Sequence, residues 1–256
     1  MHIATWNVNS IRARLPIVLD WLHANEPDIL LLQETKGEAE TFPALDFQAL
    51  GYQSHVVGQK SYNGVALISR HPVTDLMISL PGDKDDAHAR YIEGTVHDLR
   101  VASLYLPNGN PLGSDKYAYK LAWMSRLKSR MDELLKTERA VILGGDFNVI
   151  PEPEDVYAPQ AWEGDALYAL ETRKAFRELI HSGYTDAFRA LHAHETEAYT
   201  FWDYQAGAWQ KNEGLRIDHF LLSPEAVDRL ASCIIDKKPR ALEKASDHTP
   251  VVLSLL

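Results

Sequence analysis

Several apolar runs of this chain begin or end with a polar side chain that can bind a metal ion or take part in catalysis. The clearest is Glu34, which with Gln33 follows four apolar residues in "ILLLQETK". Burying a carboxylate is costly unless it is paired or bound to a metal. A salt bridge to Lys36 or to a distant arginine is the structural alternative to a metal ligand at this position.

Eight further polar residues stand at the ends of such runs. An aspartate or asparagine there is commonly a turn residue, and an aspartate and a histidine can form a structural hydrogen-bonded pair. The number of these residues exceeds what turns require. If the strands run in both directions, their ends share one edge of the sheets and these side chains converge. The set comprises three acids, three amides, a tyrosine and a histidine: Asp146, Asp218, Asp247, Asn7, Asn108, Asn148, Tyr105 and His248.

These residue types favour metal-assisted phosphoryl transfer. Oxygen ligands without cysteine or clustered histidine favour Mg²⁺ or Mn²⁺ over zinc, and amide, phenol and imidazole donors suit the charge that builds on phosphate oxygens. The sequence "HAH" at 192–194 is a weak zinc candidate, expected at a solvated helix end. The chain lacks the glycine-rich loops of nucleotide and dinucleotide binding and the Gly-x-Ser-x-Gly motif of serine hydrolases.

The elements that must position these residues can be read from the apolar pattern. Short runs typical of strands occur at 2–8, 28–34, 64–70, 100–106, 139–147, 216–223 and 250–256. Helices are predicted at 116–136, from a Ser10 N-cap to before Pro27, and at 172–182 and 224–231. The stretch 150–171 reads as a long, ordered, functional loop. We expect a single domain over residues 1–256, an α/β layered sandwich.

Composition excludes several other classes of protein. With 45% hydrophobic and 24% charged residues in 256, the chain is neither disordered nor a coiled coil. A net charge of -10 argues against a nonspecific coat for nucleic acid, but allows an enzyme with an acidic metal site and a basic rim. The single cysteine, Cys233, is expected to be a buried thiol. Without a signal peptide or membrane span, a cytoplasmic location is expected.

Nine motifs, in order and spanning nearly the whole chain, resemble the exonuclease III group of apurinic/apyrimidinic (AP) endonucleases. "GDFN" or "SDH" alone indicates only the wider endonuclease/exonuclease/phosphatase superfamily, whereas "LQETK", "YLPNG" and "GLRIDH" are typical of its DNA-repair branch. One departure is Ser10, where family members often have glycine. The motifs are "WNVNSIRAR" (6–14), "LLQETK" (31–36), "YNGVALIS" (62–69), "YLPNG" (105–109), "GDFNV" (145–149), "DVYAP" (155–159), "YTFWDY" (199–204), "GLRIDHFLLS" (214–223) and "SDHTPV" (246–251).

This resemblance implies a fold and an activity. The fold is a four-layered α/β sandwich, with two packed mixed β-sheets flanked by helices. The activity is Mg²⁺-dependent (or Mn²⁺-dependent) incision of double-stranded DNA on the 5′ side of abasic sites, with 3′-to-5′ exonuclease or 3′-phosphatase activity at 3′ ends, by a monomer. The alternatives are a superfamily relative that acts on RNA or a small phosphoester, and a DNA-binding protein that has lost catalysis.

The resemblance also implies a role for each polar residue. Glu34 is the principal metal ligand, with Asn7 and Asp247 nearby. Asp146, helped by Asn148, orients and deprotonates the attacking water, or alternatively protonates the leaving oxygen.

By the same resemblance, the remaining residues are expected to contact the substrate. His248, held by Asp218, contacts the scissile phosphate, while Tyr105 and Asn108 steady its oxygens. A snug apolar pocket accepts a base-free sugar and excludes an intact nucleotide. The pocket residues are Phe201, Trp202, Leu215 and Ile217, and the flanking phosphates are met best by Arg90 and Arg216.

Overall fold

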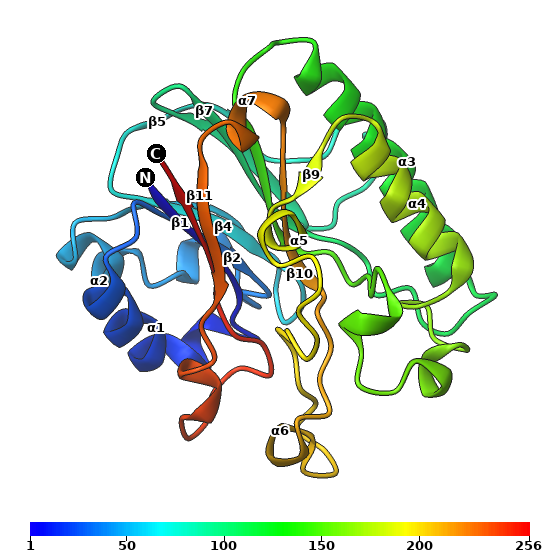
Figure 1. Ribbon diagram of the computed structural model, residues 1–256. Helices are drawn as coiled ribbons and strands as arrows, with labels where there is room; N and C mark the ends of the chain where they lie inside the picture. Colours follow the sequence, from blue (N-terminus) through cyan, green and yellow to red (C-terminus); the bar gives the residue numbers. More distant parts are fainter.

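Two six-stranded β-sheets pack face to face in the computed structural model, which describes residues 1–256 (Figure 1). Each sheet mixes parallel and antiparallel pairs, as the resemblance implies. The first has the order β11-β12-β1-β2-β4-β3, with β1 (His2–Asn7), β2 (Ile29–Gln33), β3 (Gln53–Val57), β4 (Val65–Ser69), β11 (Leu230–Ile235) and β12 (Val251–Leu255). The second has the order β5-β6-β7-β8-β10-β9, with β5 (Val73–Met77), β6 (Tyr91–Val96), β7 (Leu99–Tyr105), β8 (Val141–Asp146), β9 (Thr185–Asp186) and β10 (Asp218–Leu222).

Helices cover the outer faces of both sheets. The helices α1 (Ile11–Asn25) and α2 (Ala44–Ala49) pack on the first sheet, and α3 (Asp115–Leu135) and α4 (Leu170–His181) lie side by side over the second (Figure 1). Three short helices complete the fold: α5 (Ala187–Leu191), α6 (Ala208–Lys211) and α7 (Pro224–Val227). The result is the predicted four-layered sandwich. No helix here combines the length and the apolar character that crossing a bilayer requires.

The continuous apolar runs follow from this layering. In β2, Ile29 and Leu31 face the core between the sheets, whereas Leu30 and Leu32 face the core beneath α1 and α2. Successive side chains of a strand point to opposite faces, so a strand covered on both faces is apolar throughout. All seven strands predicted from such runs are present.

The structure differs from the predicted elements in two ways. The segment 224–231, predicted as a helix, is helical only over α7 (Pro224–Val227), and β11 begins at Leu230 because the chain turns back to pair with β12. Five strands were not predicted, namely β3, β5, β6, β9 and β11. Of these, β3, β5, β9 and β11 lie at sheet edges, where no long apolar run is needed.

The turn before α1 shows why glycine would suit position 10, where this chain has serine. The helix begins at Ile11 and ends before Pro27, as predicted, but the Ser10 side chain makes no capping hydrogen bond. Ser10 instead has φ 86°, in the region that favours glycine. Its main-chain N–H donates to the Glu34 carbonyl oxygen (2.7 Å). This turn therefore joins the start of α1 to the loop that carries Glu34.

Candidate active site

The polar residues at the strand ends converge on one edge of the two sheets. The parallel strands β1 and β2 both end there, with Asn7 opposite Gln33. In the second sheet β7 and β8 end there in parallel, and antiparallel β10 begins there, which places Tyr105 and Asp218 on either side of Asp146. The N-terminal end of β12, preceded by His248, reaches the same edge because β12 is antiparallel to β1.

Asn7 joins two carboxylates from different sheets. Its Nδ2 donates to Glu34 Oε1 (2.8 Å) and to Asp146 Oδ2 (2.9 Å). Glu34 follows β2 with φ 51°, and its second oxygen lies 2.8 Å from Lys36 Nζ. The Lys36 ion pair named as the structural alternative is therefore present, but Glu34 also bonds to the centre of the polar cluster. Burial raises the pKa of Glu34, yet the hydrogen bonds from Asn7 and Lys36 prevail and hold it below its ordinary value.

His248 lies between two buried aspartates. Its Nδ1 is 2.8 Å from Asp218 Oδ2, and its Nε2 is 3.7 Å from Asp146 Oδ2. Burial alone would lower the pKa of His248, but Asp218 and Asp146 raise it to about 10. The imidazole is therefore protonated at neutral pH and presents an N–H towards the carboxylate of Asp146.

Asp146 has a pKa suited to proton transfer. The residue is 1% exposed, and burial raises its pKa to about 7, opposed by His248 and increased further by Asp218. A general base or acid works best when its pKa lies near the working pH. Asp146 Oδ1 also accepts the main-chain N–H of Asn148 (2.9 Å), which fixes the carboxylate in place.

Tyr105, Asn108 and Asn148 surround the same carboxylates. Burial, Glu34 and Asp146 together raise the pKa of Tyr105 well above its ordinary value, so the phenol remains a donor. Asn148 Nδ2 donates to the Leu106 carbonyl oxygen (2.9 Å), and its Oδ1 lies 3.4 Å from Asn108 Nδ2. These three neutral side chains can meet phosphate oxygens without adding charge.

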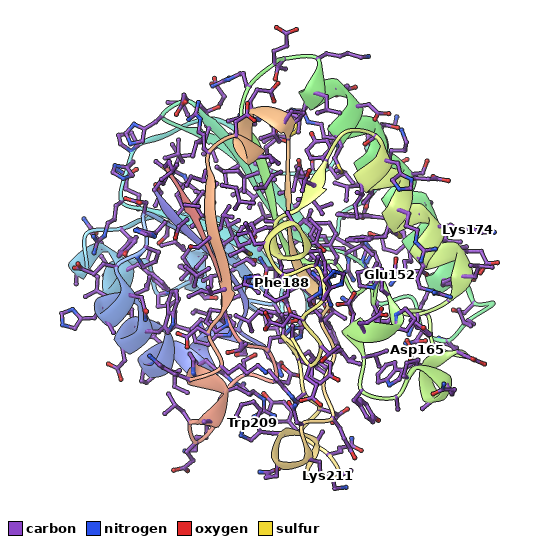
Figure 2. All side chains as sticks on the ribbon, in the orientation of Figure 1. Glu152, Asp165, Lys174, Phe188, Trp209 and Lys211 are labelled. Atoms are coloured by element: carbon purple, nitrogen blue, oxygen red, sulfur yellow. The ribbon has the colours of Figure 1, made fainter.

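The cluster opens into a cavity of about 260 Å³. Three of the four predicted apolar pocket residues, Phe201, Leu215 and Ile217, line it, and the Phe201 ring packs edge-on against His248 at 4.9 Å between centroids. Asp247 also lines the cavity and accepts a hydrogen bond from Asn9 Nδ2 (3.2 Å). Five lining residues were not predicted individually: Asn110, Trp162, Asp165, Leu167 and Asp203. Three of these belong to 150–171, the loop predicted to be functional, where Figure 2 shows Asp165.

Trp202, predicted as a pocket residue, lies outside the cavity. Its ring is fully buried between Tyr199 and Trp209, with Trp209 edge-on at 4.8 Å, and its Nε1 donates to Asn212 Oδ1 (3.1 Å). Trp209 belongs to α6, and Figure 2 labels it at the lower end of the molecule. Trp202 is therefore a core residue, because it points away from its cavity-lining neighbour Phe201.

Arg216, predicted to contact DNA, is also buried. Arg216 is 1% exposed, and its guanidinium lies between Asp155 Oδ1 (2.7 Å) and Asp186 Oδ2 (2.8 Å). Leu215 and Ile217 face the cavity, so the residue between them must point the opposite way. The prediction is wrong because of this alternation: Arg216 points away from the cavity, and each of its three side-chain nitrogens already bonds within the protein.

Arg90 remains a predicted substrate contact. Its guanidinium stacks on the Tyr105 ring at 4.7 Å, and one nitrogen donates to the Tyr105 carbonyl oxygen (3.2 Å). Together with Asn108 it lines a second groove of about 460 Å³ next to the central cavity.

The donor set fits a hard divalent cation. The ligand atoms of Glu34, Asp146 and His248 lie within 4.8 Å of one another. Glu34 and Asp146 supply the oxygen atoms of this group, and oxygen donors suit Mg²⁺ or Mn²⁺. Asn7 presents its amide nitrogen to the carboxylates while its Oδ1 accepts the Asn9 N–H (3.0 Å). Asn7 would have to turn its amide to bind the ion.

A family model and a curated relative, both matched over nearly the whole chain, indicate the same family. The Endonuclease/Exonuclease/phosphatase family matches residues 4–248. An exodeoxyribonuclease of Bacillus subtilis is 32% identical over 258 residues, covering 99% of this chain and 98% of that protein.

Two solved structures are similar over their whole length. An AP endonuclease from Archaeoglobus fulgidus is 38% identical, with a TM-score of 0.96 and coverage of 100% of this chain and 99% of the other. A 3′-5′ exonuclease from Neisseria meningitidis is 40% identical, with a TM-score of 0.97 and the same coverage. The chain therefore belongs to the exonuclease III group of AP endonucleases, within the endonuclease/exonuclease/phosphatase family.

Proposed function

We propose that this protein is a Mg²⁺-dependent phosphodiesterase that cleaves double-stranded DNA on the 5′ side of abasic sites and also acts at 3′ ends. The proposal rests on the convergence of Glu34, Asp146 and His248 on one cavity. The relatives are named as an exodeoxyribonuclease, an AP endonuclease and a 3′-5′ exonuclease, which supports a DNA phosphodiester as the substrate.

The chemistry divides among the charged residues according to their surroundings. The protonated His248 donates its Nε2–H to an oxygen of the scissile phosphate and offsets the negative charge that develops there. Asp146, with a pKa of about 7, takes the proton of the attacking water, or in the alternative role protonates the leaving 3′ oxygen. Tyr105 and Asn108 donate to the other phosphate oxygens.

Glu34 and Asp247 would hold the metal ion at the mouth of the same cavity. Mg²⁺ bound there would polarise the phosphate and stabilise negative charge in the transition state. Glu34 suits this role because its side chain keeps 18% exposure and a pKa below the ordinary range, so it stays ionised. Lys36 pairs with Glu34, and its side chain is 28% exposed to solvent.

The apolar wall supports recognition of a sugar that lacks its base. Phe201, Leu215 and Ile217 line the cavity beside His248, and the loop residues Trp162 and Leu167 add to this surface. A flipped sugar without a base fits an apolar space that an intact nucleotide would overfill.

A duplex with one central tetrahydrofuran lesion tests the proposal. With Mg²⁺ we expect a single incision on the 5′ side of the lesion that leaves a 3′ hydroxyl, no incision in EDTA, and none at the same position of an undamaged duplex. RNA and small phosphomonoesters, the alternative substrates, serve as competitors. An intact lesion duplex in Mg²⁺, or preferential turnover of a competitor, would reject the proposal.

We further propose that the protein acts as a monomer. The cytoplasmic location expected from the sequence stays a prediction.

A further inference from the structure

One lysine is buried directly behind the proposed phosphate site. Lys120 lies on α3 and is 0% exposed. Its Nζ donates to the main-chain carbonyl oxygens of Asn108 (3.0 Å) and Asn148 (2.6 Å). Its amine thus bonds to two main-chain carbonyls and not to a carboxylate.

These two carbonyls belong to the loops that follow β7 and β8. The same two residues, Asn108 and Asn148, line the central cavity, and their side-chain amides lie 3.4 Å apart. The amine therefore joins two separate loops at the residues whose side chains face the substrate. Since a residue's carbonyl and side chain share one Cα, fixing the carbonyl restricts where the amide can lie.

The loop around Asn108 packs closely against the aliphatic part of the Lys120 side chain. Gly109 has φ 88°, and a Cβ at this position would lie 2.6 Å from Lys120 Cδ. Only glycine allows both this conformation and this close approach. The loop thus wraps closely around the lysine.

Packing alone does not account for a lysine here. Methionine has nearly the same length and volume and would fill the space without burying an amine. Burial lowers the pKa of the Lys120 amine to about 7, opposed by Asp146 and Asp165, which reflects the cost of placing a charge there. The two hydrogen bonds are the feature that methionine would not replace.

We propose that Lys120 is a positioning residue that ties the loop of Asn108 to the loop of Asn148 and so holds both amides in place for the scissile phosphate. The inference rests on the proposed function for its catalytic consequence, but the loop connection itself does not depend on the identity of the substrate. Lys120 acts through Asn108 and Asn148 and does not touch the substrate.

The test compares Lys120→Met with Lys128→Met in the full chain. Lys128 lies on the same helix but is partly exposed and pairs with Asp132 (2.7 Å), so it matches the change in chemistry away from the site. In Lys120→Met we expect faster amide hydrogen exchange confined to the loops 106–110 and 147–150. On the tetrahydrofuran duplex we expect kcat to fall by roughly 10- to 100-fold, the scale of a small misplacement, with little change in KM. Lys128→Met should match the wild type in all three measurements.

A double variant separates positioning from general stability. If Lys120 acts through the two amides, Lys120→Met should slow Asn148→Ala less than it slows the wild type, because the contribution made through Asn148 is already lost and only that through Asn108 remains. If the fold-reductions in kcat of the two single variants simply multiply in the double variant, the proposal is contradicted.

The exchange measurement decides the proposal even if the wild type leaves the lesion duplex intact, which would reject the proposed function alone. Unchanged exchange in both loops, or faster exchange spread over α3 and both sheets, would overturn the positioning role. Should Lys120→Met fail to fold, Lys120→Gln carries the same test, since its shorter amide cannot reach both carbonyls. Wild-type exchange and kcat in a folded Lys120→Gln would equally overturn it.

Discussion

Neighbouring charges set different protonation states for the side chains of one small cavity. Glu34 stays ionised, Asp146 has a pKa of about 7, and His248 has a pKa of about 10. The sequence could predict that these residues stand at strand ends, because they interrupt or bound apolar runs. It could not predict their protonation, because that depends on burial and on partners such as Asp218, which is 30 residues away from His248.

Removing the carboxylate of Glu34 should weaken metal binding more than it disturbs the phosphate contacts. In Glu34→Ala we expect the Mg²⁺ concentration for half-maximal incision to rise at least roughly tenfold, the scale of one lost charge-assisted contact. The check is a Mg²⁺ titration of incision rate. Glu40→Ala, an exposed acid in the loop that follows, is the control. A titration curve identical to that of the wild type would place the metal ligand elsewhere.

His219, next to Asp218 but turned away from the cavity, should make stability depend on pH. Burial, with nearby Arg216, lowers its pKa to about 4 from 6.5. As the pH falls from 6.5 to 4, the unfolded chain gains a proton that the folded chain does not, so stability is lost in this window.

This pH dependence can be isolated by comparison with His219→Gln. Between pH 7 and pH 5 the wild type should lose about 2 kcal/mol more unfolding free energy than the variant. Urea denaturation at both pH values measures the difference. Equal losses in the two proteins would show that His219 can take up a proton in the folded state.

At the level of elements, a buried ion-pair network fixes the segment 150–171 to the second sheet. Asp155, in the loop 150–171, pairs with Arg216 and Arg189, and Arg216 also pairs with Asp186 at the end of β9. The network lies behind Leu215 and Ile217, so it supports the apolar wall of the cavity. This explains how a segment with only two short 3-10 helices, Pro153–Asp155 and Pro159–Trp162, before α4 is held in one conformation.

Breaking the network should be costly because it leaves buried charge unpaired. We expect Asp155→Ala to lower the free energy of unfolding by about 3 to 5 kcal/mol. Asp132→Ala, which breaks the partly exposed pair with Lys128, should cost less than about 1 kcal/mol. Urea denaturation of both variants checks the contrast. A loss in Asp155→Ala as small as that in Asp132→Ala would mean that the network contributes little.

Elements differed in how well the sequence predicted them. Strands such as β2 were predicted because both of their faces are buried, which forces a continuous apolar run. Edge strands such as β5, whose three central residues are exposed, carry no such run and were missed. Likewise Phe201 was predicted in the cavity and is there, whereas its neighbour Trp202 is not. Adjacent residues of one motif point in opposite directions, which a motif alone does not show.

At the scale of the whole molecule, the site depends on the two ends of the chain meeting. The first strand, β1, pairs with the last, β12, and the two termini lie side by side (Figure 1). This pairing brings Asn7 and His248 to the same sheet edge although 240 residues separate them. We propose on this basis that residues 1–256 act as one structural unit, because neither half of the chain contains a complete site.

Asp146 is expected to act on the phosphate that this assembly holds, and the variant Asp146→Asn examines that role. Asparagine keeps the shape of the side chain but can neither accept nor deliver the proton. For the tetrahydrofuran duplex we expect Asp146→Asn to keep its affinity within a few fold while single-turnover cleavage slows by at least about a thousandfold, the scale of a lost general acid or base. A folded Asp146→Asn that cleaves at nearly the wild-type rate would show that Asp146 is not the group that transfers the proton.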